Sequence, residues 1–144
     1  MDTKKIIEME KKYIMQTYAR FPAVIDHGKD CYVFDKNKKK YIDLVGGIAT
    51  CPIGHANKKV SQAVCNQSKK LLNASNLYYS EPQIILAKNL AKLSGLSKCF
   101  FCNSGAEANE AAIKLARKHT GKTDIIAMKG AFHGRTFGAL SATW

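Results

Sequence analysis

Apolar residues recur at helical spacing in four stretches of this 144-residue chain. The pattern predicts amphipathic helices over residues 4–18, from 57 to about 72, from 80 to about 94, and from about 105 to 120. Asn57, Ser80 and Ser104 stand where helix caps are expected. Ser80 and Ser104 are each followed three residues later by Gln or Glu, which completes a capping box. Gly95 and Gly121 are expected to end the last two helices.

Shorter apolar runs without helical spacing predict strands. Residues 31–34 and 41–44 flank a polar, lysine-rich turn and indicate a β-hairpin, and residues 23–25 can begin a strand before it. Residues 99–102 and 125–128 are apolar without alternation, as in strands that a parallel sheet covers on both faces. Strand, helix and strand in this order form a βαβ unit, so the expected fold class is α/β.

The turn at Ser104 is a candidate anion site. In a βαβ unit the helix begins at the carboxyl edge of the sheet, where its unpaired N–H groups and the positive end of its dipole attract phosphates and carboxylates. Gly105 and Ala106 are small enough for an oxyanion to reach their backbone amides. The alternative is an ordinary capped helix without a ligand.

A second loop, residues 129–136, follows the second predicted strand and is expected at the same edge of the sheet. It carries Phe132, His133 and Arg135, and with the Ser104 turn it would form a pocket for a flat anionic molecule. Each of the three has a plainer reading, as a core ring, a structural imidazole and a surface charge. Their clustering favours a binding site.

Charge and cysteine content narrow the classes of function. The net charge of +12 comes from lysines scattered along the chain, whereas a nucleic-acid binder concentrates Lys and Arg on one element. Five cysteines at irregular spacing predict a reducing cytoplasm and no disulfide framework. Cys99 and Cys102 would point to opposite faces of a strand, so we expect buried apolar thiols there and no metal site. No signal peptide or membrane-spanning stretch is present, which predicts a soluble protein.

Two long motifs carry a family resemblance. Residues 103–117, N-S-G-A-E-A-N-E-A-A-I-K-L-A-R, and residues 131–136, A-F-H-G-R-T, resemble the class III (subgroup II) aminotransferases that use pyridoxal 5′-phosphate. G-G-I-A at 46–49, G-H at 54–55 and S-N-L-Y-Y-S-E-P at 75–82 match as well, so the resemblance covers most of the chain. Within the family, the runs are more similar to the N-acetylornithine branch than to the 4-aminobutyrate or ornithine branches.

The resemblance implies a fold and a role for particular residues. The fold would be the amino-terminal part of a fold-type I pyridoxal-phosphate-dependent transferase. Residues 1–55 would hold a helix and β-hairpin of the small domain, and residues 56–144 the start of the α/β large domain. The cofactor-binding residues would be Ser104, Gly105 and Ala106 at the phosphate and Phe132 against the pyridine ring.

The substrate side of the site follows from the same resemblance. Arg135 would bind a substrate carboxylate, and Tyr18 would line the substrate entrance. His133 would support its loop and transfer no proton. The implied reaction passes an amino group from N-acetylornithine, or a related ω-amino acid, to 2-oxoglutarate in a cytoplasmic homodimer. The alternatives are another class III activity, such as 4-aminobutyrate or ornithine aminotransferase, or a non-catalytic chain that keeps only the phosphate-binding helix terminus.

One departure from the family limits this expectation. The family's Schiff-base lysine and the aspartate that pairs with the pyridine nitrogen would follow Trp144, and no lysine among residues 1–144 has the right context. We therefore expect a fragment with no catalytic residue of its own, inactive by itself. A nicotinamide-dependent oxidoreductase is disfavoured because its G-x-G-x-x-G turn is missing.

Overall fold

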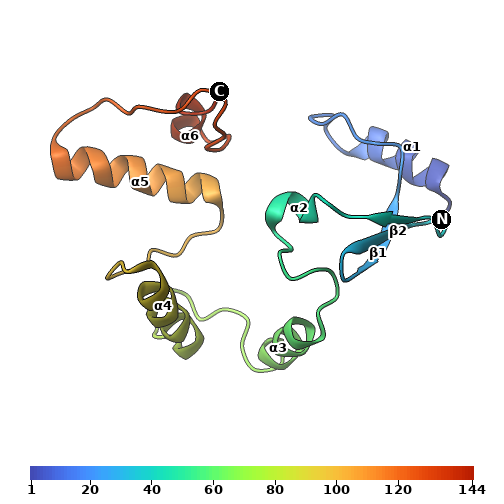
Figure 1. The fold of residues 1–144 in the computed structure, drawn as a ribbon, viewed down its shortest axis with the longest axis horizontal. Helices are drawn as coiled ribbons and strands as arrows, with labels where there is room; N and C mark the ends of the chain where they lie inside the picture. Colours follow the sequence, from blue (N-terminus) through green and yellow to red (C-terminus); the bar gives the residue numbers. More distant parts are fainter. The chain divides into compact units, whose positions relative to one another are not determined.

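The computed structural model describes all 144 residues, which divide into two compact units, Met1–Ser75 and Asn76–Trp144. Figure 1 shows the helices and strands of both units in chain order. These units are not the predicted domains. The boundary between small and large domain after residue 55 stays a prediction.

The first unit contains α1 (Thr3–Tyr13) and a small antiparallel sheet. The strands are β1 (Ile25–Lys29), β2 (Tyr32–Asp35) and β3 (Lys40–Ile42), paired in that order. The predicted hairpin is confirmed, with Val33 opposite Tyr41. Helix α1 is also confirmed, but it ends five residues earlier than predicted, since Ile14 is already extended.

Asp35 fixes the turn of the hairpin. Its carboxylate accepts hydrogen bonds from the backbone amides of Asn37 (2.8 Å) and Lys39 (2.9 Å) and from the Tyr41 hydroxyl (2.9 Å). Asp35 is one of the few buried residues of the chain. The Lys39 amide bond is the largest cause that lowers the pKa of Asp35, whereas the bond to Asp35 raises the pKa of Tyr41.

After the hairpin the chain makes a left-handed turn, α2 (Gly46–Ala49), followed by a regular helix, α3 (Lys58–Ser68). The four residues of α2 have φ between 54° and 62°, which glycine adopts freely and Ile48 and Ala49 do not. Asp43 supports this turn by accepting from the Val45 and Gly46 amides, and its other oxygen lies 2.7 Å from His55 Nε2.

The second unit is helical. It contains α4 (Glu81–Ser94), α5 (Gly105–Thr120) and α6 (Phe137–Ser141). Gly95 and Gly121 end α4 and α5 in the left-handed conformation, as predicted. Asn57 caps α3 as expected, but Ser80 stands at the start of α4 without a side-chain capping bond, so the predicted capping box there is wrong. No helix of the chain has the length and apolar character needed to cross a membrane.

The predicted strands at residues 99–102 and 125–128 are not formed in this structure. A strand needs a ladder of hydrogen bonds to a neighbour, and neither segment pairs with the other or with β1–β3. The predicted βαβ unit is therefore not formed. Helix α5 lies between two unpaired apolar segments, in which Phe100 and Ile126 are exposed. Cys99 and Cys102 are exposed free thiols, so the prediction that they are buried is wrong.

The best-packed part of the second unit is the contact between α5 and α6, which lie side by side (Figure 1). Ala139 and Ala142 are the only buried apolar residues of the chain. Both belong to α6 and its C-terminal end. The packing of this unit is thus concentrated where α6, which follows residues 131–136, contacts α5, which contains most of residues 103–117.

Candidate binding site at the start of helix α5

The first turn of α5 leaves two backbone amides for a ligand. Of its first four amides, that of Glu107 donates to Ser104 Oγ (3.2 Å) and that of Ala108 donates to Ser104 O (3.1 Å). The amides of Gly105 and Ala106 have no acceptor in the chain, as expected at a helix start. Ser104 is thus confirmed as the cap, and the helix begins at Gly105 as predicted.

The carboxylate of Glu107 closes the turn in a modified capping box. A capping box predicts a bond from Glu107 to the amide of the cap residue itself. Here Glu107 Oε2 instead accepts from the amide of Asn103 (2.7 Å), one residue earlier, and the carboxylate is also within reach of the Asn103 side-chain amide. This bond holds the extended approach to the helix against its first turn.

A hollow of about 550 Å³ lies between the start of α5 and the loop that precedes α6. It is lined by residues of both motifs: Ser104, Gly105, Ala106, Asn109, Phe132, His133, Gly134, Arg135 and Thr136. The prediction that the two loops form one pocket is therefore confirmed in the geometry. A Cβ atom added at Gly105 would meet nothing within 4 Å, so space is open directly above the helix start.

Close packing joins the loop to the first turn of α5. Gly134 has a φ of 135°, and a Cβ atom there would lie 2.6 Å from the Cβ of Ala106 and 3.1 Å from that of Ala139. Only glycine combines this backbone angle with so short an approach. The wall of the hollow is therefore set by small residues on both sides.

Side-chain hydrogen bonds hold the loop at three further points. Asn109 Nδ2 donates to the carbonyl of His133 (2.6 Å). The Thr143 hydroxyl accepts from the amides of His133 (3.0 Å) and Gly134 (3.2 Å), and its own hydrogen can go to the carbonyl of Gly134 or of Ala139. The loop is thus bonded to α5 on one side and to the segment after α6 on the other.

Glu110 makes the third connection. Its Oε1 accepts from the Thr136 hydroxyl (2.7 Å) and from the amides of Gly138 (2.8 Å) and Ala139 (3.1 Å). The bond from Thr136 is the largest cause that lowers the pKa of Glu110, followed by the bond from the Ala139 amide. Burial acts in the opposite direction, and the Gly138 amide makes a smaller contribution that lowers the pKa. Helical spacing predicts an exposed Glu110–Lys114 pair, but the main contacts of this carboxylate are with the loop and α6.

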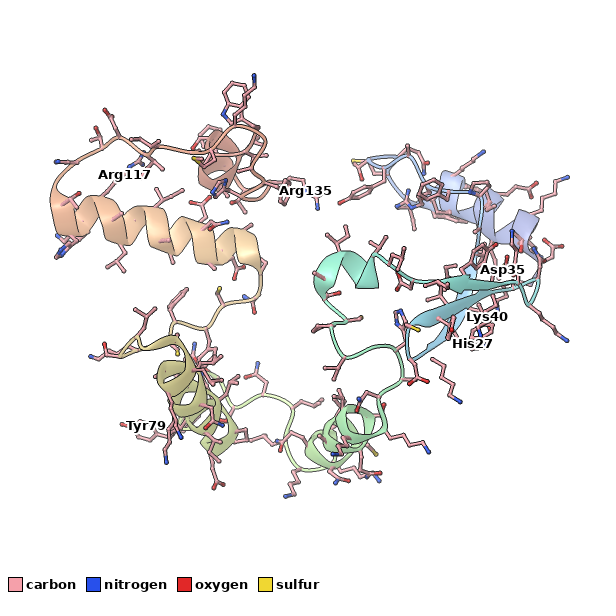
Figure 2. All side chains as sticks on the ribbon, in the orientation of Figure 1. His27, Asp35, Lys40, Tyr79, Arg117 and Arg135 are labelled. Atoms are coloured by element: carbon pink, nitrogen blue, oxygen red, sulfur yellow. The ribbon has the colours of Figure 1, made fainter.

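The predicted site residues of the loop occupy different positions around the hollow. Phe132 is 69% exposed, so one face of its ring is open to a ligand. Arg135 is also exposed and extends from the loop before α6 (Figure 2). His133 is half-buried, and its Nδ1 is enclosed without a hydrogen-bond partner. This burial agrees with a supporting role for His133 and disfavours proton transfer through Nδ1.

Tyr18 belongs to the first unit. Its ring lies 5.6 Å from Cζ of Arg20, and with Phe21 and Pro22 it lines a pocket against α1. The structure therefore brings Ser104, Gly105, Ala106, Phe132 and Arg135 together around one hollow. Tyr18 lies in the other unit, so its place at the substrate entrance stays a prediction.

The site suits a phosphorylated, planar ligand. Two free amides at the positive end of a helix bind a phosphate, an exposed aromatic face stacks on a ring, and a guanidinium pairs with a carboxylate. The open space at Gly105 and the small residues opposite it leave room for the phosphate oxygens. Residues 1–144 contain no group of His, Cys, Asp and Glu arranged to bind a metal ion.

Comparisons with known proteins agree with this geometry. Residues 13–144 match the family described as aminotransferase class-III. Acetylornithine aminotransferases from Methanothermobacter thermautotrophicus and Archaeoglobus fulgidus are 52% and 53% identical over 99% and 95% of the chain. A taurine:2-oxoglutarate aminotransferase from Bifidobacterium kashiwanohense, solved in complex with PLP and glutamate, aligns with a TM-score of 0.91 and 28% identity over 99% of the chain.

The similarity extends over part of each relative only. The chain spans 37% and 36% of the length of the two acetylornithine aminotransferases and 33% of the solved structure. Within that span, the solved structure supports the expected α/β fold class of a pyridoxal-phosphate-dependent transferase.

Proposed function

The chain belongs to the class-III aminotransferase family, and on this premise we propose that it forms the phosphate-binding part of a pyridoxal-phosphate-dependent acetylornithine aminotransferase. The observation that carries the proposal is the pair of free amides at Gly105 and Ala106, which open into a hollow bordered by Phe132 and Arg135. Names and identities of the relatives support the choice of amino donor.

Each residue of the hollow has a defined task in this proposal. The amides of Gly105 and Ala106 bind the cofactor phosphate, while Ser104 holds the helix start in place through its bond to Glu107. The ring of Phe132 packs against the face of the pyridine and excludes water from it. When bound, the cofactor serves as the electron sink for the transfer of the amino group.

The charge of Arg135 and the names of the relatives support the proposed substrates. Arg135 would bind a carboxylate of the amino donor, which is N-acetylornithine or a related ω-amino acid, and the acceptor is 2-oxoglutarate. A planar guanidinium suits this task because it pairs with both carboxylate oxygens. A homodimer in the cytoplasm remains part of the proposal, as does the place of Tyr18 at the substrate entrance. A 4-aminobutyrate or ornithine donor is the alternative.

The phosphate site is tested by Gly105→Pro. Proline is favoured at the first position of a helix, Ser104 before it is already extended (φ −155°, ψ 161°), and the space around position 105 is open. The variant should therefore keep the helix and lose one amide donor and the free approach to the helix start. We expect the affinity for pyridoxal phosphate to fall about tenfold or more, and that for pyridoxal, which has no phosphate, to stay within about twofold.

Thr3→Pro is the matched control, because it makes the same type of change at the first position of α1 behind an extended Asp2. It should leave both affinities unchanged. Equal affinities of the unmodified protein for pyridoxal phosphate and pyridoxal would contradict the proposed phosphate site. If the protein prefers pyridoxal phosphate to pyridoxal but does not turn over N-acetylornithine, the proposed phosphate site stands and the proposed activity is wrong.

A further inference from the structure

We propose that Glu110 is a positioning residue that makes the phosphate-binding helix start and the loop carrying Phe132 and Arg135 into one rigid piece. This inference rests on the proposed function and extends it to a residue that touches neither cofactor nor substrate. It concerns how the two halves of the site are kept in register.

The first argument is the number of donors that converge on one oxygen. Glu110 Oε1 accepts from the Thr136 hydroxyl and from the amides of Gly138 and Ala139, all within 3.1 Å. These donors lie at the start of α6, where backbone amides need acceptors from outside the helix. Thr136 stands at the cap position but makes no side-chain capping bond to α6. Glu110 therefore replaces the local cap and attaches α6 to α5.

The second argument is the close approach of two glycines to α5. A Cβ atom added at Gly138 would overlap the carboxylate of Glu110, so that carboxylate would have to leave its present position at the start of α6. One turn earlier on α5, Gly134 approaches Ala106 in the same way. Two glycines thus bring the loop and α6 against one face of α5.

The third argument is the position of the site residues between these attachment points. Arg135 lies between Gly134, which packs on Ala106, and Thr136, which donates to Glu110. Asn109, next to Glu110 on α5, holds the carbonyl of His133. The segment that carries Arg135 is thus fixed to α5 on both sides, and loss of Glu110 releases the side nearer α6.

We expect loss of Glu110 to weaken substrate binding more than cofactor binding. Without Glu110, the amides of Gly105 and Ala106 remain at the start of α5, so phosphate binding persists. The loop, however, loses its fixed distance from them, so contacts through Arg135 weaken. A purely structural role for Glu110 would instead lower all functions together, in proportion to the protein that unfolds.

The test compares Glu110→Gln with Glu8→Gln in the full-length enzyme. Glu8 is an exposed glutamate of α1, so the control makes the same chemical change away from the site. For Glu110→Gln we expect KM for the carboxylate-bearing amino donor to rise about tenfold, while affinity for pyridoxal phosphate changes less than about threefold. Glu8→Gln should change neither.

A double-mutant cycle with Thr136→Val identifies the contact. Both changes act on the same bond, because Thr136→Val removes its donor and Glu110→Gln removes the charge of its acceptor. Their effects on KM should therefore be less than additive, with a coupling of about threefold to tenfold. Additive effects would overturn the inference, as would parallel losses in KM and cofactor affinity for Glu110→Gln. Thr136→Val keeps the two amide bonds to Glu110, so it is the variant to compare if Glu110→Gln does not fold.

A third measurement needs no substitution at the site. In the unmodified enzyme labelled with ¹⁵N-glycine and ¹⁵N-alanine, the amide protons of Gly138 and Ala139 should shift together in acid, as Glu110 is protonated. Lys114 is the other charged group that acts on this carboxylate. Amides that do not titrate would overturn the inference even if pyridoxal phosphate binds as proposed. Failure of the unmodified enzyme to prefer pyridoxal phosphate over pyridoxal would count against the proposed function instead.

Discussion

Arg135 is an exposed residue of the loop that borders the hollow, whereas the two amides that would hold a phosphate belong to the start of α5. A substitution there can therefore separate substrate binding from cofactor binding. For Arg135→Ala in the full-length enzyme we expect KM for the carboxylate-bearing donor to rise at least about tenfold, since a charge-assisted pair is lost. The affinity for pyridoxal phosphate should stay within about twofold of the unmodified enzyme.

Arg135→Lys is the matched variant for this measurement, because it keeps the charge and removes the planar fork. Steady-state kinetics should place its KM between those of the unmodified enzyme and Arg135→Ala. An unchanged KM in Arg135→Ala would show that another residue binds the substrate carboxylate.

At the same scale, sequence patterns predict residues whose role is local. Ser104 is assigned correctly because a cap acts on an amide three residues away. The sequence misassigns Glu110 because its partners, Thr136, Gly138 and Ala139, lie 26 to 29 residues further along the chain. A glutamate in a helix followed by Lys four residues later predicts an exposed pair unless tertiary contacts replace it. The only sequence feature that points to these contacts is glycine at positions 134 and 138. Glycine indicates that another part of the chain approaches the backbone closely, but it does not identify that part.

Among the elements, the β2–β3 hairpin has the clearest dependence on pH. Asp35 has a pKa lowered mainly by its bond to the Lys39 amide, so it stabilises the hairpin at pH values above the pKa of the unfolded chain, and this contribution is lost as pH falls through the folded pKa. Tyr41 has a pKa raised by Asp35, so its contribution is complete below the unfolded pKa and lost as pH rises through the folded one. Stability of the hairpin should therefore decrease in both acid and alkali.

The Asp35–Tyr41 bond can be measured directly by NMR titration of the Tyr41 ring carbons. In Asp35→Asn the pKa of Tyr41 should fall back toward 10.0, the ordinary value for tyrosine. Asp30→Asn is the control, since it removes the same charge at a left-handed position (φ 52°) that asparagine tolerates. A Tyr41 titration that is identical in the unmodified chain and in Asp35→Asn would contradict the role assigned to this bond.

The elements also show why some boundaries are predictable. Helix starts at Asn57 and Ser104, and ends at Gly95 and Gly121, are marked by residues that act locally, and the structure has them where expected. The ends of α1 and α3 carry no such residue, and both helices are shorter than the periodicity indicates. Strands at residues 99–102 and 125–128 depend on a partner elsewhere, so an apolar run alone does not establish them.

For the whole molecule, the apolar segments on either side of α5 have the largest consequence. Ile126 is 96% exposed, although its neighbours form the kind of run that parallel sheets bury on both faces. So much exposed apolar surface should make a chain of 144 residues bind hydrophobic dyes and associate in solution. In a protein of the relatives' length, the same segment would be covered by neighbouring strands.

Substitution of Ile126 by lysine should therefore have opposite effects in the two contexts. In the isolated 144-residue chain, Ile126→Lys should reduce dye binding and association, because it places a charge on an exposed apolar segment. In the full-length enzyme it should lower the free energy of unfolding by several kcal/mol, on the order of the cost of burying an unpaired charge. Ile126→Val is the control for both, since it keeps the segment apolar. The measurement is urea unfolding of the isolated chain and of the full-length enzyme, each with and without the substitution. A full-length enzyme whose free energy of unfolding is unchanged by lysine at this position would show that residues 125–128 are not a central strand.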